Sequence, residues 1–408
     1  MEVAVTGIGL VSPLGNTPAA ALAAAIAGRS AVRRLDTPEA ARLAAPVAAT
    51  AVLDGSIAFE PQKLRQLDRI GLFALHAARD ALADAGLAPG DVDPQRAGVF
   101  FGTGMGGTGA VDDSYRALYG DRTDRVKPFA VLMGMYHAPA AWIGIETGFR
   151  GPNLTYSTAC ASSAVALGEA WRRIASGELD VAIAGGAEAP LTLGPLKAWE
   201  ALHALAPMDE RDPSASCRPF SRNRRGLVLA EGAALLVLER QDRAAARGAR
   251  SHGRILGFGL SNDATHLTRP SVEGQAAALQ AALASAGIAP QAVDAINAHG
   301  TGTVANDAAE TAAIRLVFGG HAGRLPVSAT KAVHGHLLGA AGALECVLSL
   351  LAMSGRVLLP TMNLDEPDPA CDLDYVAGCA REGVDVRIML SSSFAFGGCN
   401  AVLALGAA

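Results

Sequence analysis

The chain of 408 residues has little charge, with 18% charged residues against 50% hydrophobic ones. This balance excludes disorder, because disordered chains are rich in charge and poor in apolar side chains. The net charge of −5 and the pI near 6.0 give no overall attraction to nucleic acid or to an anionic membrane. We therefore expect neither as a partner. The length is enough for two or three domains and a large core.

Close cysteine pairs and targeting signals are also missing. The six cysteines are Cys160, Cys217, Cys346, Cys371, Cys379 and Cys399. Their scattered spacing does not match a zinc site, and we expect reduced thiols in a cytoplasmic protein. The start, MEVAVTGIGLVSPLG, lacks the basic region and long apolar stretch of a signal peptide. Charged and imidazole side chains interrupt the apolar stretch 331–353, which favours a buried helix over a membrane span.

An internal repeat is the main organising feature. ALADAGLAP at 81–89 matches ALASAGIAP at 282–290, and the turn FFGTG at 100–104 matches AHGTG at 298–302. Farther on, the helix-like 161–177 precedes LDVAIAGG, as the helix-like 335–355 precedes VLLP. Long apolar strands alternating with helices predict an α/β protein. We expect two similar halves, 1–250 and 251–408, connected through 243–253, with a ligand site where they meet.

Cys160 lies in TYSTACASSAVALGEAWRR, where a β-prone run ends at Thr158 and a helix begins at once. A thiol at such a turn is near the positive end of the helix dipole, which favours the reactive thiolate. Small neighbours leave room for a substrate. Taken alone, a cysteine in an alanine-rich stretch is more often an inert core residue, so the segment does not establish catalysis.

Three other segments carry candidate polar groups. In INAHGTGTVANDAAETAA, His299 lies at the end of a strand and a glycine turn follows it, and Glu310 is either functional or a solvated helix charge. In VSATKAVHGHLLGAAGALE, Lys331 and His336 lead into a helix of small residues, and no ligand cluster at zinc spacing accompanies them. In SSSFAFGGCN, two glycines let backbone N–H groups approach a ligand. Each has a structural alternative, such as a satisfied histidine or an ordinary glycine turn.

Together, Cys160, AHGTGT, TKAVHGHLLGAAGALE and FAFGG form an ordered set that resembles the elongating β-ketoacyl-[acyl carrier protein] synthases, closest to the synthase II-like type. Four motifs match in order over essentially the whole chain. The resemblance implies the thiolase-like fold, a duplicated αβαβα arrangement in five layers, which agrees with the repeat. It also implies an acyltransferase that performs a decarboxylative Claisen condensation in type II fatty acid, polyketide or polyene biosynthesis.

The family's Cys–His–His triad falls on Cys160, His299 and His336. The resemblance implies that Cys160 takes an acyl group from an acyl carrier protein, and that the histidines stabilise the enolate formed when malonyl-ACP loses carbon dioxide. The N–H groups of Cys160 and Phe396 would form the oxyanion hole, and Phe396 would also gate the acyl pocket. Lys331 would be a supporting residue paired with Glu310, because an unpaired buried lysine is unfavourable.

Further positions follow from the same resemblance. They are Met105 and Met133 at the acyl pocket, Thr268, Thr301 and Thr303 at the phosphopantetheine arm, and Lys63, Arg65, Arg69 and Arg218 at the carrier-protein surface. For the four surface residues a solvated charge is an equal alternative. No cofactor is expected, because phosphopantetheine arrives on the carrier protein. The expected partners are that protein and either a second copy of the chain or a related ketosynthase-like subunit.

A metal at the catalytic centre is not expected. Asn297, Glu345, Ser391 and Asn400 resemble a structural cation site of some relatives, which we do not count as catalytic.

The sequence departs from the family pattern in two places. The gate loop has Ala395 and Cys399 where the family has glycine and threonine, and alanine is predicted to restrict the loop. The stretch 131–144, with Met135, Tyr136 and His137, is predicted to reshape the acyl pocket, which leaves the acyl substrate open. Three rivals remain: a non-catalytic chain-length factor, which lacks the cysteine; a thiolase, which lacks GHLLGAAG; and an initiating synthase, which needs asparagine at His336.

Overall fold

A ten-stranded mixed sheet organises the molecule. The structure is a computed structural model that describes residues 1–53, 59–88 and 90–408. Five strands from the first part of the chain follow one another in the sheet: β5 (Asn153–Tyr156), β4 (Ala97–Gly102), β6 (Val181–Glu188), β7 (Gly232–Arg240) and β1 (Val3–Val11). Five from the second part continue it: β8 (Gly253–Asn262), β14 (Cys399–Gly406), β13 (Ile388–Phe394), β9 (Ala295–Asn297) and β10 (Val327–Ser328).

The two groups of strands have the same topology. Counted from the outer edge, β5-β4-β6-β7-β1 corresponds to β10-β9-β13-β14-β8. The first two pairings in each group are parallel and the next two are antiparallel. β1 and β8 pair antiparallel over only three residues, Val3 to Val5, and so join the groups into one sheet. The internal repeat is therefore a structural duplication.

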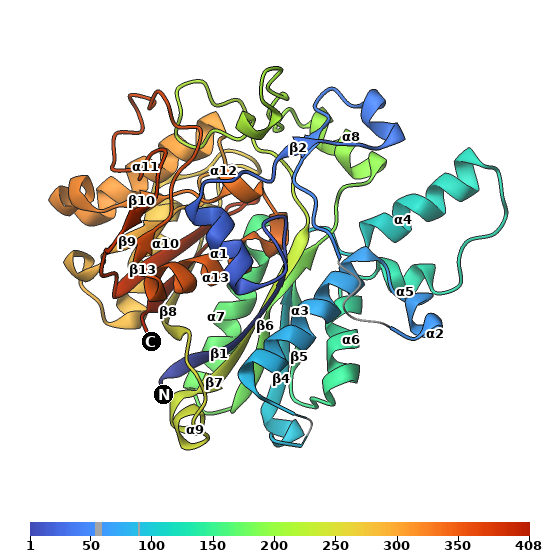
Figure 1. The fold of residues 1–408 in the computed structure, drawn as a ribbon, viewed down its shortest axis with the longest axis horizontal. Helices are drawn as coiled ribbons and strands as arrows, with labels where there is room; N and C mark the ends of the chain where they lie inside the picture. The colour runs from blue at the N-terminus through green and yellow to red at the C-terminus, as the bar shows by residue number, and fades with distance from the viewer. Residues whose placement is uncertain (54–58, 89) are drawn as a thin grey trace.

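Helices form three layers around the strands (Figure 1). In the centre, α7 (Ser162–Ala175) packs on α13 (Ala341–Ser354), and both contact strands of the two groups. On one outer side, α3 (Arg69–Ala85) covers β1 and β7, and on the other, α10 (Val272–Ala286) and α11 (Val304–Phe318) cover the second group. Strands β6 and β1 are buried along their whole length, as their apolar sequences predict. The predicted duplicated αβαβα fold is confirmed.

One part of the predicted repeat is wrong. VLLP, which follows α13, contributes only β11 (Val357–Leu358), which pairs with β12 (Arg381–Glu382) outside the main sheet. The counterpart of β6 is β13, because the second half makes a long excursion before it returns to the sheet. Pro89, the last residue of the first ALADAGLAP copy, lies outside the described residues.

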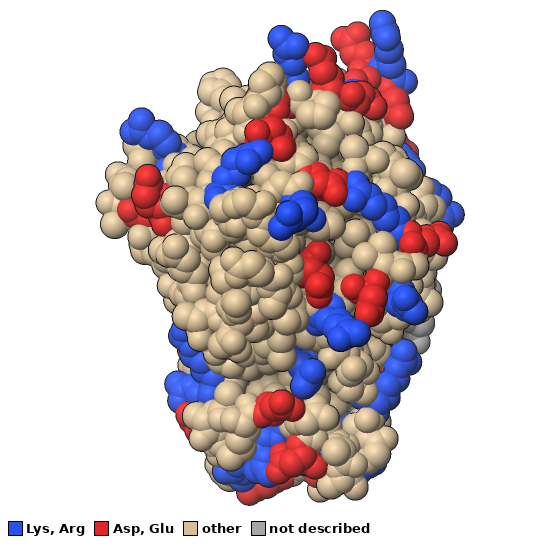
Figure 2. Space-filling view, turned by 90° about the vertical axis from the view of Figure 1, so that its left-hand side faces the viewer, with Lys and Arg blue, Asp and Glu red and all other residues tan. Residues whose placement is uncertain are grey.

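The remaining helices and short strands surround this frame. They are α1 (Pro18–Ile26), α2 (Pro61–Leu64), α4 (Thr108–Tyr115), α5 (Ala130–Gly134), α6 (Ala138–Thr147), α8 (Leu193–Ala201), α9 (Gln241–Ala246), α12 (Lys331–His334), β2 (Arg33–Arg34) and β3 (Val47–Ala48). Within the described part of the chain, no helix is both long and apolar enough to span a bilayer. On the side where α10 and α11 lie, Lys and Arg side chains are interspersed with Asp and Glu (Figure 2).

Candidate active site

Cys160 lies on a one-turn 3₁₀ helix, η4 (Ala159–Ala161), between β5 and α7. Ala159 has a φ of +48°, a left-handed conformation that alanine adopts only under constraint. The Ser162 hydroxyl holds the turn, because it accepts the Thr158 N–H at 2.9 Å and donates to the Ala159 carbonyl at 2.6 Å. The resulting bend directs the buried Cys160 thiol toward the second half, where His336 Nε2 lies 3.1 Å from the sulfur.

Opposing effects act on the ionisation of the Cys160 thiol. Burial raises the pKa of Cys160 to about 12, although the Lys331 charge and the N–H groups of Phe396 and Cys160 act in the opposite direction. Burial thus opposes the effect of the helix dipole, which was expected to favour the thiolate. The two N–H groups that face the sulfur are those expected to form the oxyanion hole.

His299 and His336 lie side by side, with ring centroids 5.4 Å apart and planes at 82°. The Leu338 N–H donates to His336 Nδ1 at 3.2 Å, and Lys331 Nζ lies 3.3 Å from His299 Nδ1. Each Nδ1 accepts a hydrogen bond, so each neutral ring carries its proton on Nε2. Burial, followed by the nearby Lys331 charge, lowers the pKa of both imidazoles well below the usual value. The site thus offers two neutral N–H donors.

The predicted pairing of Lys331 with Glu310 is wrong. Lys331 Nζ forms an ion pair with Glu345 Oε1 and donates to the His299 carbonyl at 2.6 Å. Lys331 and Glu345 are both fully buried. Glu310 instead accepts the backbone N–H groups of His299 at 2.7 Å and Gly300 at 2.9 Å. Both acids therefore position His299, Glu345 through the lysine and Glu310 through the backbone. Burial raises the pKa of each carboxyl to about 7.

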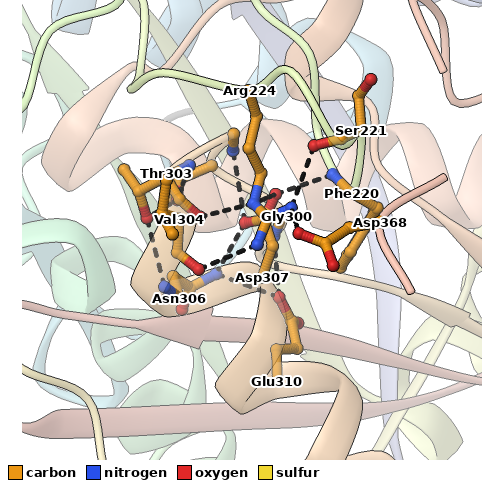
Figure 3. Close-up of polar contacts among 12 residues, drawn as sticks. Phe220, Ser221, Arg224, Gly300, Thr303, Val304, Asn306, Asp307, Glu310 and Asp368 are labelled. Carbon is orange, nitrogen blue, oxygen red and sulfur yellow. Dashed lines mark hydrogen bonds and ion pairs between the residues drawn. The ribbon is translucent and has the colours of Figure 1, made fainter. Parts of the chain in front are cut away.

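A buried polar network supports the turn after His299 (Figure 3). Arg224 donates to the carbonyls of Thr303 at 3.1 Å and Val304 at 2.9 Å, and to Asp368 at 2.6 Å. Asp307 accepts the N–H of Phe220 at 2.7 Å and that of Gly302 at 3.3 Å. This network fixes the start of α11.

The triad opens into a cleft of about 310 Å³ between the halves of the chain. Cys160, His299, His336 and Phe396 line it, together with Thr268, Thr301 and Thr303, which were predicted to contact the phosphopantetheine arm. Thr301 and Thr303 share a hydrogen bond of 2.9 Å. The structure therefore brings all seven residues to one cavity.

The predicted acyl-pocket residues lie outside this cleft. Met105 follows the β4 turn, and its N–H donates to Glu188 at 3.0 Å. Met133 is buried on α5, and its backbone contacts Gly107, where a Cβ would lie 1.8 Å from the Met133 carbonyl oxygen. Tyr136 packs against Gly106, whereas Met135 is half exposed. Ala395 does not have a positive φ, so the closed gate loop accommodates alanine without strain, and Gly397 and Gly398 have φ values of +86° and +79°.

The predicted carrier-protein residues are mostly engaged within the chain. Lys63 pairs with Glu146, and Arg218 pairs with Asp209 at 2.7 Å. Arg69 pairs with Glu231 and lies 4.6 Å from the Phe73 ring centroid. Arg65 is exposed.

Sequence reasoning missed two groups. Arg225 and Arg269 line the cleft, are exposed, and form no ion pair with any residue that the structure describes; a single sequence gave no signal for them. Glu188 is fully buried and accepts N–H groups from Gly104 at 2.7 Å and Gly339 at 2.9 Å, which joins the halves behind Cys160. Its place at the end of the apolar strand LDVAIAGGAE was the available signal for it.

Three of the four cation-like positions lie together. Asn297 and Ser391 face each other on β9 and β13, and Asn297 Nδ2 donates to the Glu345 carbonyl at 3.2 Å. The Glu345 carboxylate, however, binds Lys331, and Asn400 donates to Asp263 at 2.7 Å. The ligand atoms of Cys160, His299 and His336 lie within 4.8 Å of one another. Because both Nε2 atoms carry protons, this trio is suited to donating hydrogen bonds and poorly suited to binding a metal.

Comparison with known proteins agrees with this geometry. Residues 1–244 match the model of the beta-ketoacyl synthase N-terminal domain, and residues 252–365 match that of the C-terminal domain. Nodulation protein E of Rhizobium sp. (strain N33) is 43% identical, with 99% of this chain and 98% of the relative covered. 3-Oxoacyl-[acyl-carrier-protein] synthase 2 of Coxiella burnetii is 39% identical with the same coverage.

Solved structures show the same relationship. AntDE:AntF, a type II PKS acyl-carrier protein in complex with its ketosynthase, contains a chain that is 30% identical, with a TM-score of 0.92. The match covers 100% of this chain and 99% of that one. The chain therefore belongs to the β-ketoacyl synthase family, with a thiolase-like fold, and is an acyltransferase that catalyses the condensation reaction of that family.

Proposed function

We propose that Cys160 carries the growing acyl group and that His299 and His336 activate a malonyl unit, both substrates being delivered by an acyl carrier protein. The observation that carries this assignment is the contact between the Cys160 sulfur and His336 Nε2, beside the His299 imidazole, whose ring centroid lies 5.4 Å from that of His336. A non-catalytic partner subunit would not require a cysteine thiol in contact with an imidazole.

In the first step, Cys160 attacks the thioester of the acyl carrier protein. The new carbon–sulfur bond replaces the bond to the carrier arm, and the thiol proton leaves on the released arm. The negative oxygen of the tetrahedral intermediate accepts the N–H groups of Cys160 and Phe396, which already face the sulfur.

In the second step, malonyl-ACP replaces the emptied carrier. Loss of carbon dioxide leaves its electron pair on an enolate, whose oxygen accepts the Nε2 protons of His299 and His336. The enolate carbon attacks the acyl carbonyl, the bond to Cys160 breaks, and a β-ketoacyl-ACP is released. Lys331 and Glu310 position His299 without exchanging protons with the substrate. No resident cofactor is required, because phosphopantetheine is part of the substrate.

The carrier arm is proposed to lie in the cleft along Thr268, Thr301 and Thr303, with Arg65, Arg225 and Arg269 facing the acidic carrier. A second copy of the chain, or a related subunit, is proposed to cover the exposed apolar side chains of α5 and α6. Val131 is 79% exposed, Ile145 69% and Leu132 55%. Such a patch is typical of an interface. We propose a cytoplasmic location, where fatty acid or polyketide carrier proteins act.

The test is covalent loading. The protein is incubated with a panel of acyl-ACPs, the acyl adduct is located by mass spectrometry, and malonyl-ACP is then added. We expect an adduct on Cys160 that disappears as β-ketoacyl-ACP forms. Cys160→Ala should abolish both signals, while Cys379→Ala, at an exposed thiol, should retain them. An adduct that survives Cys160→Ala would refute the assignment.

A further inference from the structure

Phe396 packs against a residue that belongs to none of the sequence motifs. Its ring stacks on the indole of Trp199, with centroids 6.1 Å apart and planes at 26°. On the same indole, Nε1 donates to the Met105 sulfur at 3.5 Å. Trp199 on α8 thus contacts two side chains from other parts of the chain. One is Met105 in the turn after β4, and the other is Phe396 in the loop between β13 and β14.

The two sides of this contact differ in how firmly they are held. The Glu200 carboxylate, next to Trp199 on α8, accepts the N–H groups of Ala44 at 2.5 Å and Ala45 at 3.1 Å. By contrast, the loop that carries Phe396 continues into Gly397, where a Cβ would meet nothing within 4 Å. A hydrogen bond of 2.7 Å from the Gly397 N–H to the Leu267 carbonyl holds this loop to the cleft wall. Trp199 lies within α8, whereas Phe396 lies in a short loop before two glycines with positive φ, so Phe396 is the element better able to swing.

Phe396 also separates two environments. Phe396 and Cys160 line the cleft, whereas Trp199 and Met105 are absent from its lining. They belong instead to an apolar cluster with buried Leu196 and Leu338. Phe396 both lines the cleft and contacts this cluster through Trp199, so an acyl chain that enters the cluster past its ring would break the Trp199–Phe396 stack.

Building on the proposed function, we propose that Trp199 is a positioning residue that latches Phe396 shut and makes gate opening depend on the length of the acyl chain. A long chain replaces the lost ring contact by burying its own methylene groups, which an acetyl group cannot do. An aromatic pair of this kind shifts the equilibrium between the closed and open positions of Phe396 by roughly 2- to 12-fold. The latch therefore selects against short acyl groups by about that factor.

The first test reads the stack directly. The sequence has three tryptophans, so Trp142→Phe with Trp171→Phe leaves Trp199 as the sole indole. This protein is loaded from octanoyl-ACP or acetyl-ACP, freed of carrier, and checked for its adduct by mass. We expect the octanoyl adduct to change the Trp199 emission and the acetyl adduct to leave it unchanged. An octanoyl adduct without a change in emission would overturn the latch. Absence of any adduct would overturn the proposed function, and the latch with it.

The second test is kinetic. In Trp199→Ala, the rate of Cys160 loading from acetyl-ACP relative to octanoyl-ACP should rise by roughly 2- to 12-fold. Trp199→Phe keeps a ring for Phe396 and should retain the original ratio, which separates latching from general loss of packing. Equal changes for the two acyl groups would contradict the proposal. If Trp199→Ala does not fold, the emission test on the intact latch decides the question.

Discussion

The turn that carries Cys160 occurs twice in the molecule. η4 has Ala159 at a φ of +48° before Cys160, and η8 (Leu338–Ala340) has Leu338 at +47° before Gly339. A side chain fits at the first turn, whereas at the second a Cβ would lie 2.2 Å from the Gly104 nitrogen. The Gly339 N–H binds Glu188 instead of facing a thiol. Duplication therefore repeated the scaffold, and close packing confines the nucleophile to one copy.

The paired strand ends differ in the same way. Phe101, in FFGTG, corresponds to His299, in AHGTG. Phe101 is fully buried in the core under α3, while His299 faces the cleft beside Lys331. The first half thus supplies the sulfur and the second half supplies the imidazoles. Substitutions in the two halves test how strictly these catalytic roles are divided between them.

The largest effect is expected from Lys331→Met, since no ion pair among the described residues of 1–250 is fully buried on both sides. Loss of the lysine leaves Glu345 buried and unpaired and should lower the free energy of unfolding by about 3–5 kcal/mol. Urea denaturation measures the change. Lys197→Met, which removes a half-exposed pair with Glu200, should lower it by less than about 1 kcal/mol. Equal losses would show that burial of the pair is unimportant.

His299→Phe makes the second strand end like the first. Loss of one hydrogen-bond donor to the enolate should slow condensation by about 10²- to 10³-fold, while loading of Cys160 continues. Single-turnover experiments that follow the adduct and the product separate the two steps. His321→Phe, whose ring lies 3.2 Å from the Val293 carbonyl and away from the cleft lining, should change neither. Parallel loss of loading and condensation would argue against the assigned role.

Gly339→Ala tests why the second turn holds no side chain. The new Cβ would meet backbone atoms of Gly104 and Thr103, so one of the two segments must shift, at a cost of about 3 kcal/mol. Thermal unfolding should detect this loss. Gly323→Ala is the matched control, because a Cβ there meets nothing within 4 Å. If both variants unfold at the same temperature, packing does not explain the asymmetry.

The smallest effect concerns pH at the first turn. With the pKa of Cys160 raised to about 12, the thiolate is the minor form, and its fraction should grow about tenfold per unit from pH 7 to pH 9. The rate of carbamidomethylation by iodoacetamide, followed by peptide mass, should rise in proportion. Cys160→Ser gives the background from the other thiols. A plateau near neutral pH would show that the helix terminus stabilises the thiolate after all.

The internal repeat predicted two similar α/β halves, because its copies match in sequence and spacing. The triad followed from the family resemblance, since the segments of Cys160, His299 and His336 each had a structural alternative when taken alone. The partner of Lys331 was not predictable in the same way. Glu310 and Glu345 both lie on helices near the site, and the choice between them depends on which helix face turns inward. Trp199 carried no signal, because its role depends on a contact across the fold.

The central layer of α7 and α13 has a consequence for biosynthesis. Ser163 on α7 accepts the N–H of Ala343 on α13, a residue made 180 positions later, and β1 pairs with β8 as well as β7. While the second half is still on the ribosome, the inner face of α7 has no helix to cover it. Folding dominated by such distant contacts is slow and leaves apolar surface exposed. This architecture therefore exposes the first half of the chain to aggregation until the second half has been made.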